Sequence, residues 1–156
     1  MLRDQQISES QAGASATADR PLRIALLSYR SKAHSGGQGI YVRHLSRELA
    51  ALGHHVEVIS GPPYPELDEG PSLTKVPSLD LYREPDPFRV PKLREFRSPI
   101  DVYEFLSVCT GSFPEPLTFS LRARRLLENR PAAERPDIVH DNQTLGYGML
   151  FMDRPG

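Results

Sequence analysis

This chain of 156 residues has a single cysteine, no long apolar run and no large excess of either charge. The single cysteine, Cys109, excludes an internal disulfide and any metal site built from several cysteines. No apolar run approaches the roughly 20 residues that a membrane-spanning helix needs. The first twenty residues also lack the apolar core of a signal peptide. These absences favour a soluble protein of the cytoplasm.

Charge of the two signs is nearly balanced, with 19 Lys and Arg residues against 20 Asp and Glu residues and a net charge of -1. A protein held to nucleic acid through phosphate contacts usually carries a basic excess, so no nucleic-acid partner is expected. The length and the 38% of hydrophobic residues suit one globular domain. Proline, in contrast, is plentiful: 15 residues, about twice the average share.

Composition divides the chain into a tail and a domain. Residues 1–20 hold few large aliphatic side chains, which predicts a disordered tail. Residues 21–156 carry the apolar patterns of the folded domain. Eleven of the fifteen prolines lie between Pro62 and Pro116, and this stretch is predicted to be a long excursion from the sheet with one short strand at 73–76.

The start of the domain has the pattern of a strand–helix–strand unit. Residues 23–29 form a short, nearly continuous apolar run, which is typical of a strand buried on both faces of a parallel sheet. A helical stripe follows, and Gly53 is placed as its C-cap. A second strand is expected at 55–60. The apolar residues of the stripe are Val42, Leu45, Leu49 and Leu52.

Two further helices are predicted from apolar residues at helical spacing, one over 102–109 and one over 117–127. The first makes Cys109 a packing residue. On the second, Arg122, Arg124 and Arg125 are expected on a solvated face, with an anionic acceptor or the inner face of a membrane as the alternative contact.

The last elements are a buried strand over 137–141 and a helix opened by residues 142–144. The inward face of that helix would consist of Leu145, Met149 and Leu150. Alternating strands and helices of this kind predict the α/β class, with a Rossmann-like parallel sheet flanked by helices.

Ligands of parallel sheets bind at the carboxyl ends of the strands, and two sequence features meet there. Gly36 and Gly37 precede the first helix, and residues 140–142 follow the last strand. A helix start exposes unpaired N–H groups and the positive end of the dipole, and glycine lets a phosphate or a sugar approach the backbone. The spacing leaves a plain turn as the alternative to a ligand site.

The dinucleotide-binding fingerprint is incomplete here. Residues 37–42 supply two of its glycines but not the third, and Ser60 and Gly61 stand where an acidic ribose ligand would close the second strand. A nucleotide-dependent oxidoreductase is therefore the weaker alternative. A non-catalytic Rossmann-like binding or regulatory module is the other.

Three motifs in order resemble the opening of the family 4 retaining glycosyltransferases. These are the glycine loop at 35–39, the helix at 41–49 followed by the Gly-His strand entry at 53–58, and the Asp-Ile-Val-His strand at 137–140. The resemblance spans roughly residues 22–156. It implies a GT-B fold, in which this chain would be the N-terminal, acceptor-side domain of two that face a cleft.

The resemblance also implies that activity requires a longer polypeptide or a second chain. The family continues after the last helix with another apolar strand and a donor-binding domain, whereas this sequence ends at Gly156. We therefore expect a truncated N-terminal part that is inactive alone and needs a C-terminal domain in cis or in trans. The implied reaction transfers a hexose from a nucleotide-diphosphate sugar to a sugar, lipid or small-molecule acceptor, with no cofactor and no metal.

The resemblance assigns roles residue by residue. Gly36, Gly37 and Gln38 would lie against the donor diphosphate. His34 and Tyr41 are the candidate acceptor-binding residues, with a solvated loop as the alternative for His34.

His140 and Asn142 are the candidate catalytic pair. Asn142 stands where many members of the family have a second histidine. Because an amide cannot act as a charged acid or base, Asn142 is assigned to positioning the sugar. For His140 the alternative is a histidine buried in the core.

Overall fold

A computed structural model describes residues 20–31, 37–83, 85–86, 89–142 and 146–151. Its centre is a sheet of four strands: β1 (Arg23–Ser28), β2 (His55–Ser60), β3 (Ser72–Lys75) and β4 (Ile138–Asp141). The order is β3-β2-β1-β4, and every neighbouring pair is parallel. The predicted α/β class and parallel sheet are confirmed.

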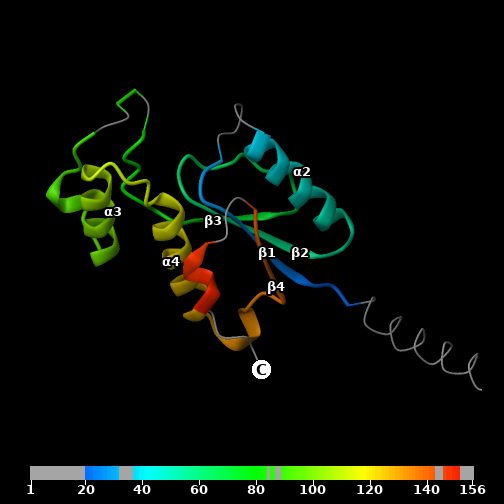
Figure 1. Ribbon diagram of the computed structural model, residues 1–156. Coiled ribbons are helices and arrows are strands. Elements are labelled where there is room, and N and C mark those ends of the chain that lie inside the picture. The colour runs from blue at the N-terminus through cyan, green and yellow to red at the C-terminus, as the bar shows by residue number, and fades with distance from the viewer. Residues whose placement is uncertain (1–19, 32–36, 84, 87–88, 143–145, 152–156) are drawn as a thin grey trace, which may run out of the picture.

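Three α-helices accompany the sheet: α2 (Gly37–Ala51), α3 (Pro99–Cys109) and α4 (Glu115–Glu128). The sheet lies between α2 on one face and α4 on the other (Figure 1). Helix α3 packs beside α4, away from the sheet (Figure 1). Short 3-10 turns occur at Leu93–Glu95, Ala132–Glu134 and Tyr147–Phe151. The arrangement is the Rossmann-like layering that the strand–helix pattern predicts.

The alternation of side chains along β1 explains why its sequence is apolar throughout. Ile24 and Leu26 are buried with Val42 under α2, whereas Ala25 and Leu27 are buried with Phe119 under α4. Successive strand side chains point to opposite faces, so a strand covered on both faces has no polar position to alternate with.

The end of α2 agrees with the sequence-based prediction except at one residue. Gly53 has a φ of +91°, the left-handed conformation that favours glycine after a helix. Leu45 and Leu49 pack against the core beside Val42. Leu52 was expected on the same stripe but is 73% exposed, because the helix ends at Ala51 before that position turns inward.

Helix α3 reverses the predicted orientation. Three residues of its expected apolar stripe face outward: Val102, Leu106 and Cys109 are exposed. The fourth, Phe105, is partly buried, with its ring centre 5.7 Å from that of Phe96. The residues that it buries are Asp101 and Glu104. The prediction that Cys109 is a packing residue is therefore wrong, because Cys109 is exposed and the side of α3 that is fully buried carries the charged contacts with α4.

The partner of these two carboxylates is Arg122 on α4. Its Nη2 lies 2.6 Å from Asp101 Oδ1 and also donates to Glu104 Oε2. Its side chain is only 11% exposed, so the expectation that Arg122 lies on a solvated face is wrong. Arg124, in contrast, is partly exposed and pairs with Glu128 one helical turn later, at 2.6 Å.

The last elements also depart from the sequence-based predictions. β4 was expected to be buried but is an edge strand, paired among the described residues with β1 alone, and Ile138 is exposed. Residues 147–151 form a 3-10 turn where an α-helix was expected. Met149 packs against the core, Leu150 is exposed, and Leu145 lies outside the described residues.

The proline-rich stretch contains the expected short strand, β3, followed by buried Val76, Leu79 and Leu81. The predicted tail lies outside the described residues, apart from Arg20. Within the part of the chain that the structure describes, no helix combines the length and apolarity needed to cross a membrane.

Candidate functional site

The carboxyl ends of the four strands meet at one edge of the sheet, which we call the carboxyl edge. Its strand ends are Ser28, Ser60, Lys75 and Asp141. The register pairs Ser28 with Ser60 and Leu27 with Asp141, so these ends lie side by side. The chain leaving β1 at this edge leads into α2, and the chain leaving β4 leads to Asn142.

The ends of β1 and β2 approach each other closely. The Gly61 N–H donates to Ser28 O at 3.2 Å, and the Ser31 N–H donates to Pro63 O at 3.0 Å. The hydroxyls of Ser28 and Ser31, both buried, hydrogen-bond to each other. A Cβ atom at residue 61 would lie 2.5 Å from Tyr29 O, so the position accepts only glycine without a backbone shift. These contacts fix the direction in which the chain leaves β1.

Gly61→Ala is therefore expected to lower the free energy of unfolding by about 2 kcal/mol, the usual cost of forcing an atom into packed structure. Urea unfolding followed by circular dichroism measures it. Gly37→Ala is the matched control, because a Cβ there would meet no described atom within 4 Å. Equal stability of the two variants would contradict the close contact at Gly61.

The predicted donor-binding residues that the structure describes open α2. Gly37 and Gln38 are its first two residues, and both are exposed. Gly37 has neither a left-handed φ nor a close neighbour among the described atoms, so neither constraint explains a glycine there. The N–H groups of this first turn and the positive end of the helix dipole lie at the carboxyl edge.

The candidate acceptor-binding residues are only partly placed. Tyr41 follows one turn further along α2 and is half exposed. His34 and Gly36 lie outside the described residues.

The candidate catalytic pair lies at the end of β4. His140 is exposed, so the alternative of a histidine buried in the core is wrong. The Asn142 N–H donates to Leu27 O at 3.1 Å, which continues the pairing with β1 one residue beyond the strand. Asp141 Oδ2 accepts from the Gly146 N–H at 2.8 Å. The structure thus holds Asn142 at the carboxyl edge beside the end of β1.

Two further residues at this edge were missed by sequence reasoning. Arg30 follows β1, and its Nη1 lies 3.3 Å from Glu115 Oε2 in the first turn of α4. Its Nη2 donates to Tyr82 O at 3.2 Å, and its guanidinium carbon lies 5.6 Å from the centre of the Tyr82 ring. Arg30 therefore ties the end of β1 to α4 and to the proline-rich stretch.

The environment of Glu115 favours its neutral form. Burial raises its pKa to about 7, Arg30 opposes that shift, and the negative charges of Glu104 and Asp80 add to it. No local motif marks this pair, because Arg30 and Glu115 are 85 residues apart in the chain.

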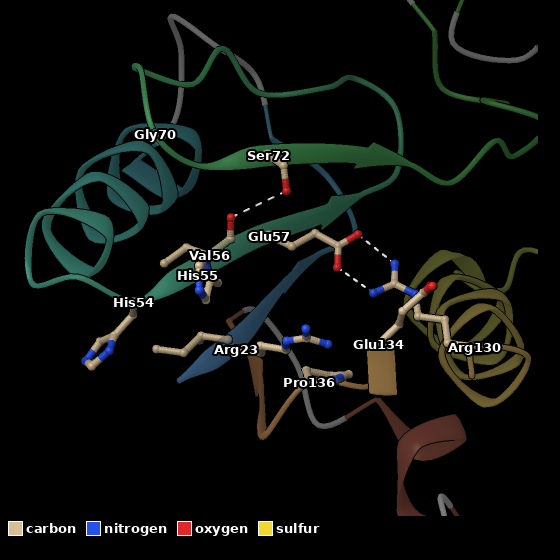
Figure 2. A pocket seen from close by; sticks show the side chains of 11 residues that line it. Arg23, His54, His55, Val56, Glu57, Gly70, Ser72, Arg130, Glu134 and Pro136 are labelled. Atoms are coloured by element: carbon tan, nitrogen blue, oxygen red, sulfur yellow. Dashed lines mark hydrogen bonds and ion pairs between the residues drawn. The ribbon is translucent and has the colours of Figure 1, made fainter. Parts of the chain in front are cut away.

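A cavity of about 440 Å³ opens at the opposite, amino-terminal edge of the sheet (Figure 2). Arg130 donates two hydrogen bonds of 2.6 Å to Glu57 there. Burial opposes ionisation of Glu57, but the hydrogen bonds from Arg130 and Thr74 outweigh it and hold its pKa below the usual value. This ion pair joins β2 to the residues that follow α4. The charged groups of this cavity therefore have a structural role, and we assign no ligand to it.

Among the residues that the structure describes, no three His, Cys, Asp or Glu side chains are arranged to hold a metal ion.

Comparisons with known proteins agree with the family resemblance of the sequence. Residues 36–154 match the glycosyl transferase 4-like domain family. A curated relative, the MMP alpha-(1->4)-mannosyltransferase of Mycolicibacterium hassiacum, is 64% identical over 136 residues, which cover 86% of this chain and 33% of the relative. The chain thus spans about a third of the length of the curated relative that it matches. Since the family match includes most of the folded chain, this chain belongs to the glycosyl transferase 4-like domain family.

Proposed function

We propose that this chain is the acceptor-side part of a retaining glycosyltransferase that moves a hexose, in the first instance mannose, from a nucleotide-diphosphate sugar to an acceptor. The observation that carries the proposal is the 64% identity to a mannosyltransferase. The remaining donor-binding part would come from a C-terminal domain, in cis or in trans. The isolated chain is then expected to transfer no sugar, and the location proposed for the reaction is the cytoplasm.

The carboxyl edge offers a physical basis for the reaction. The start of α2, with Gly37 open to solvent, would stabilise the negative charge that develops on the leaving diphosphate. Gly36 and Gln38 are proposed to share this role. Asn142 would hold a hydroxyl of the transferred sugar, and His140 would lie near the reacting carbon. His34 and Tyr41 are proposed to contact the acceptor.

A chimera provides the test. This chain replaces the matching 136 residues of the Mycolicibacterium hassiacum enzyme, and mannosyl transfer to the acceptor of that enzyme is measured. We expect the chimera to be active. A folded but inactive chimera would contradict the proposal and favour a non-catalytic binding module.

Variants of the chimera then test the site. Gly37→Val, whose side chain would keep the diphosphate away from the N–H groups of the first turn of α2, is expected to lower kcat/KM about 100-fold or more, the scale seen when a donor to developing charge is lost. Asn142→Ala is expected to lower kcat at least about 10-fold, as one lost hydrogen bond to substrate would. Asn129→Ala, an exposed amide at the far end of α4, is the matched control. Equal decreases in kcat for Asn142→Ala and Asn129→Ala would contradict the role proposed for Asn142.

A further inference from the structure

A second cavity, of about 630 Å³, lies between α4, the start of α3 and the segment that follows β3. Four cationic side chains line it against two carboxylates, so the lining carries a net positive charge. The cations are Lys75, Arg97, Arg122 and Arg125. Because the whole chain has a net charge of -1, this concentration of positive charge is a local feature.

The two carboxylates of the lining are already engaged by the protein. Asp101 binds Arg122 and accepts from the Ser98 N–H at 2.7 Å, as part of the cap of α3. Glu95 binds Arg89 and accepts from the Lys92 N–H at 2.9 Å. Because Arg122 is itself paired with Asp101 and Glu104, the uncompensated positive charge of the lining lies on Lys75, Arg97 and Arg125.

Arg122 is held rigidly with part of its guanidinium unused. Its Nη2 makes both carboxylate contacts, and no group among the described residues accepts from its Nε or Nη1. Neither nitrogen is among the fully buried polar atoms without a partner in the described structure, so both keep some solvent exposure, and Arg122 is one of the residues that line the cavity. A guanidinium fixed in this way offers donors at no further cost in side-chain entropy.

The remaining cations complete the charged wall. Arg97 and Arg125 are exposed, and no carboxylate among the described residues lies within ion-pair distance of either. Lys75 is exposed, and its Nζ lies 5.0 Å from the centre of the Tyr64 ring. Val76, Ile100 and Leu126 supply apolar walls that strengthen the interaction with a charge.

We propose that this cavity binds the phosphate of a soluble small molecule, a phosphomonoester or a diphosphate. Arginine recognises phosphate through several donors on one planar group, and several arginines on an apolar pocket form a specific anion site. The proposal goes beyond the transfer reaction, because the cavity is built from α4, the start of α3, the end of β3 and the segments between β3 and α3, and includes none of the residues assigned to donor, acceptor or catalysis.

Calorimetric titration of the whole chain with inorganic pyrophosphate tests it. We expect saturable binding that remains in Gly37→Val, the variant of the proposed donor site. The double variant R97A/R125A is expected to weaken the affinity at least about 10-fold, because it removes two of the charged donors that would contact the anion. The control R94A/R124A removes the same charge from neighbouring positions that do not line the cavity, and is expected to change the affinity less than about twofold.

Four outcomes would overturn the proposal. These are the absence of saturable binding, equal weakening in both double variants, loss of binding in Gly37→Val with R97A/R125A unaffected, and binding to phosphatidic acid vesicles in the absence of pyrophosphate binding. The third would assign the anion to the start of α2 and the fourth to a lipid headgroup. Neither result depends on whether the chimera transfers mannose, so the two proposals fail separately.

Discussion

Replacing Arg122 by methionine is expected to lower the free energy of unfolding by about 3–5 kcal/mol, which is the usual cost of breaking a buried charge pair from one side. The variant leaves Asp101 and Glu104 facing each other with no cation, and Glu104 is 1% exposed. Arg124→Met is the matched control on the same helix. Its pair with Glu128 is partly exposed, so its loss is expected to cost less than about 1 kcal/mol.

The same variant has a predicted pH dependence. Burial disfavours the charge of Asp101, but hydrogen bonds from Arg122, Ser98 and the Arg97 N–H hold its pKa below the usual value. Its charged form therefore stabilises the folded chain above its unfolded pKa of about 4, and that contribution disappears as the pH falls. Without Arg122, the cost of burying the Asp101 charge is no longer offset by its cation, so protonation of Asp101 at low pH is expected to restore part of the stability that the variant loses. Urea unfolding at pH 7 and pH 4.5 measures the free energy of unfolding of the unchanged chain and of Arg122→Met. The difference between the two proteins is expected to be smaller at pH 4.5. An equal difference at both pH values would contradict a role for the Asp101 charge in the loss of stability.

Glu115→Gln is expected to stabilise the protein at pH 8 by about 2–3 kcal/mol and to have little effect at pH 4.5. The folded pKa of Glu115 is raised to about 7 by burial, above its usual value of 4.5. The Glu115 carboxyl therefore keeps its proton to a higher pH in the folded chain than in the unfolded chain. The free energy of unfolding then falls as the pH rises from about 4.5 to 7 and above. Glutamine is neutral throughout and avoids this loss.

Urea unfolding at the two pH values measures the effect of Glu115→Gln. Glu128→Gln, a partly exposed carboxylate at the other end of α4, is the control and is expected to change stability by less than about 1 kcal/mol at either pH. A gain that is equal at pH 4.5 and pH 8 would show that Glu115 is not held neutral in the folded protein.

The elements that could be predicted are those whose signal is local. β1 is apolar throughout because α2 covers one face and α4 the other, and this condition is visible in six consecutive residues. Gly53 ends α2 because the chain there needs a left-handed φ. The glycine loop, the helix and the two strand motifs also lie in order along the chain, which is why the family could be inferred from them.

The features that could not be predicted depend on residues far apart in the sequence. The apolar positions of α3 have helical spacing, but spacing does not tell which face of a helix turns inward. Asp101 and Arg122 are 21 residues apart, and Arg30 and Glu115 are 85 apart. Both pairs form only once α4 is in place beside the sheet.

The sequence by itself determined the parallel sheet, the helix that begins at its carboxyl edge and the family, because each is encoded by short runs of neighbouring residues. Tertiary structure alone decided that Arg122 is buried, that β4 is an edge strand and that Glu115 is surrounded by Arg30, Glu104 and Asp80. The physical reason is the balance between desolvation and pairing: a charge is buried only where a distant partner meets it, and the fold decides which partners meet.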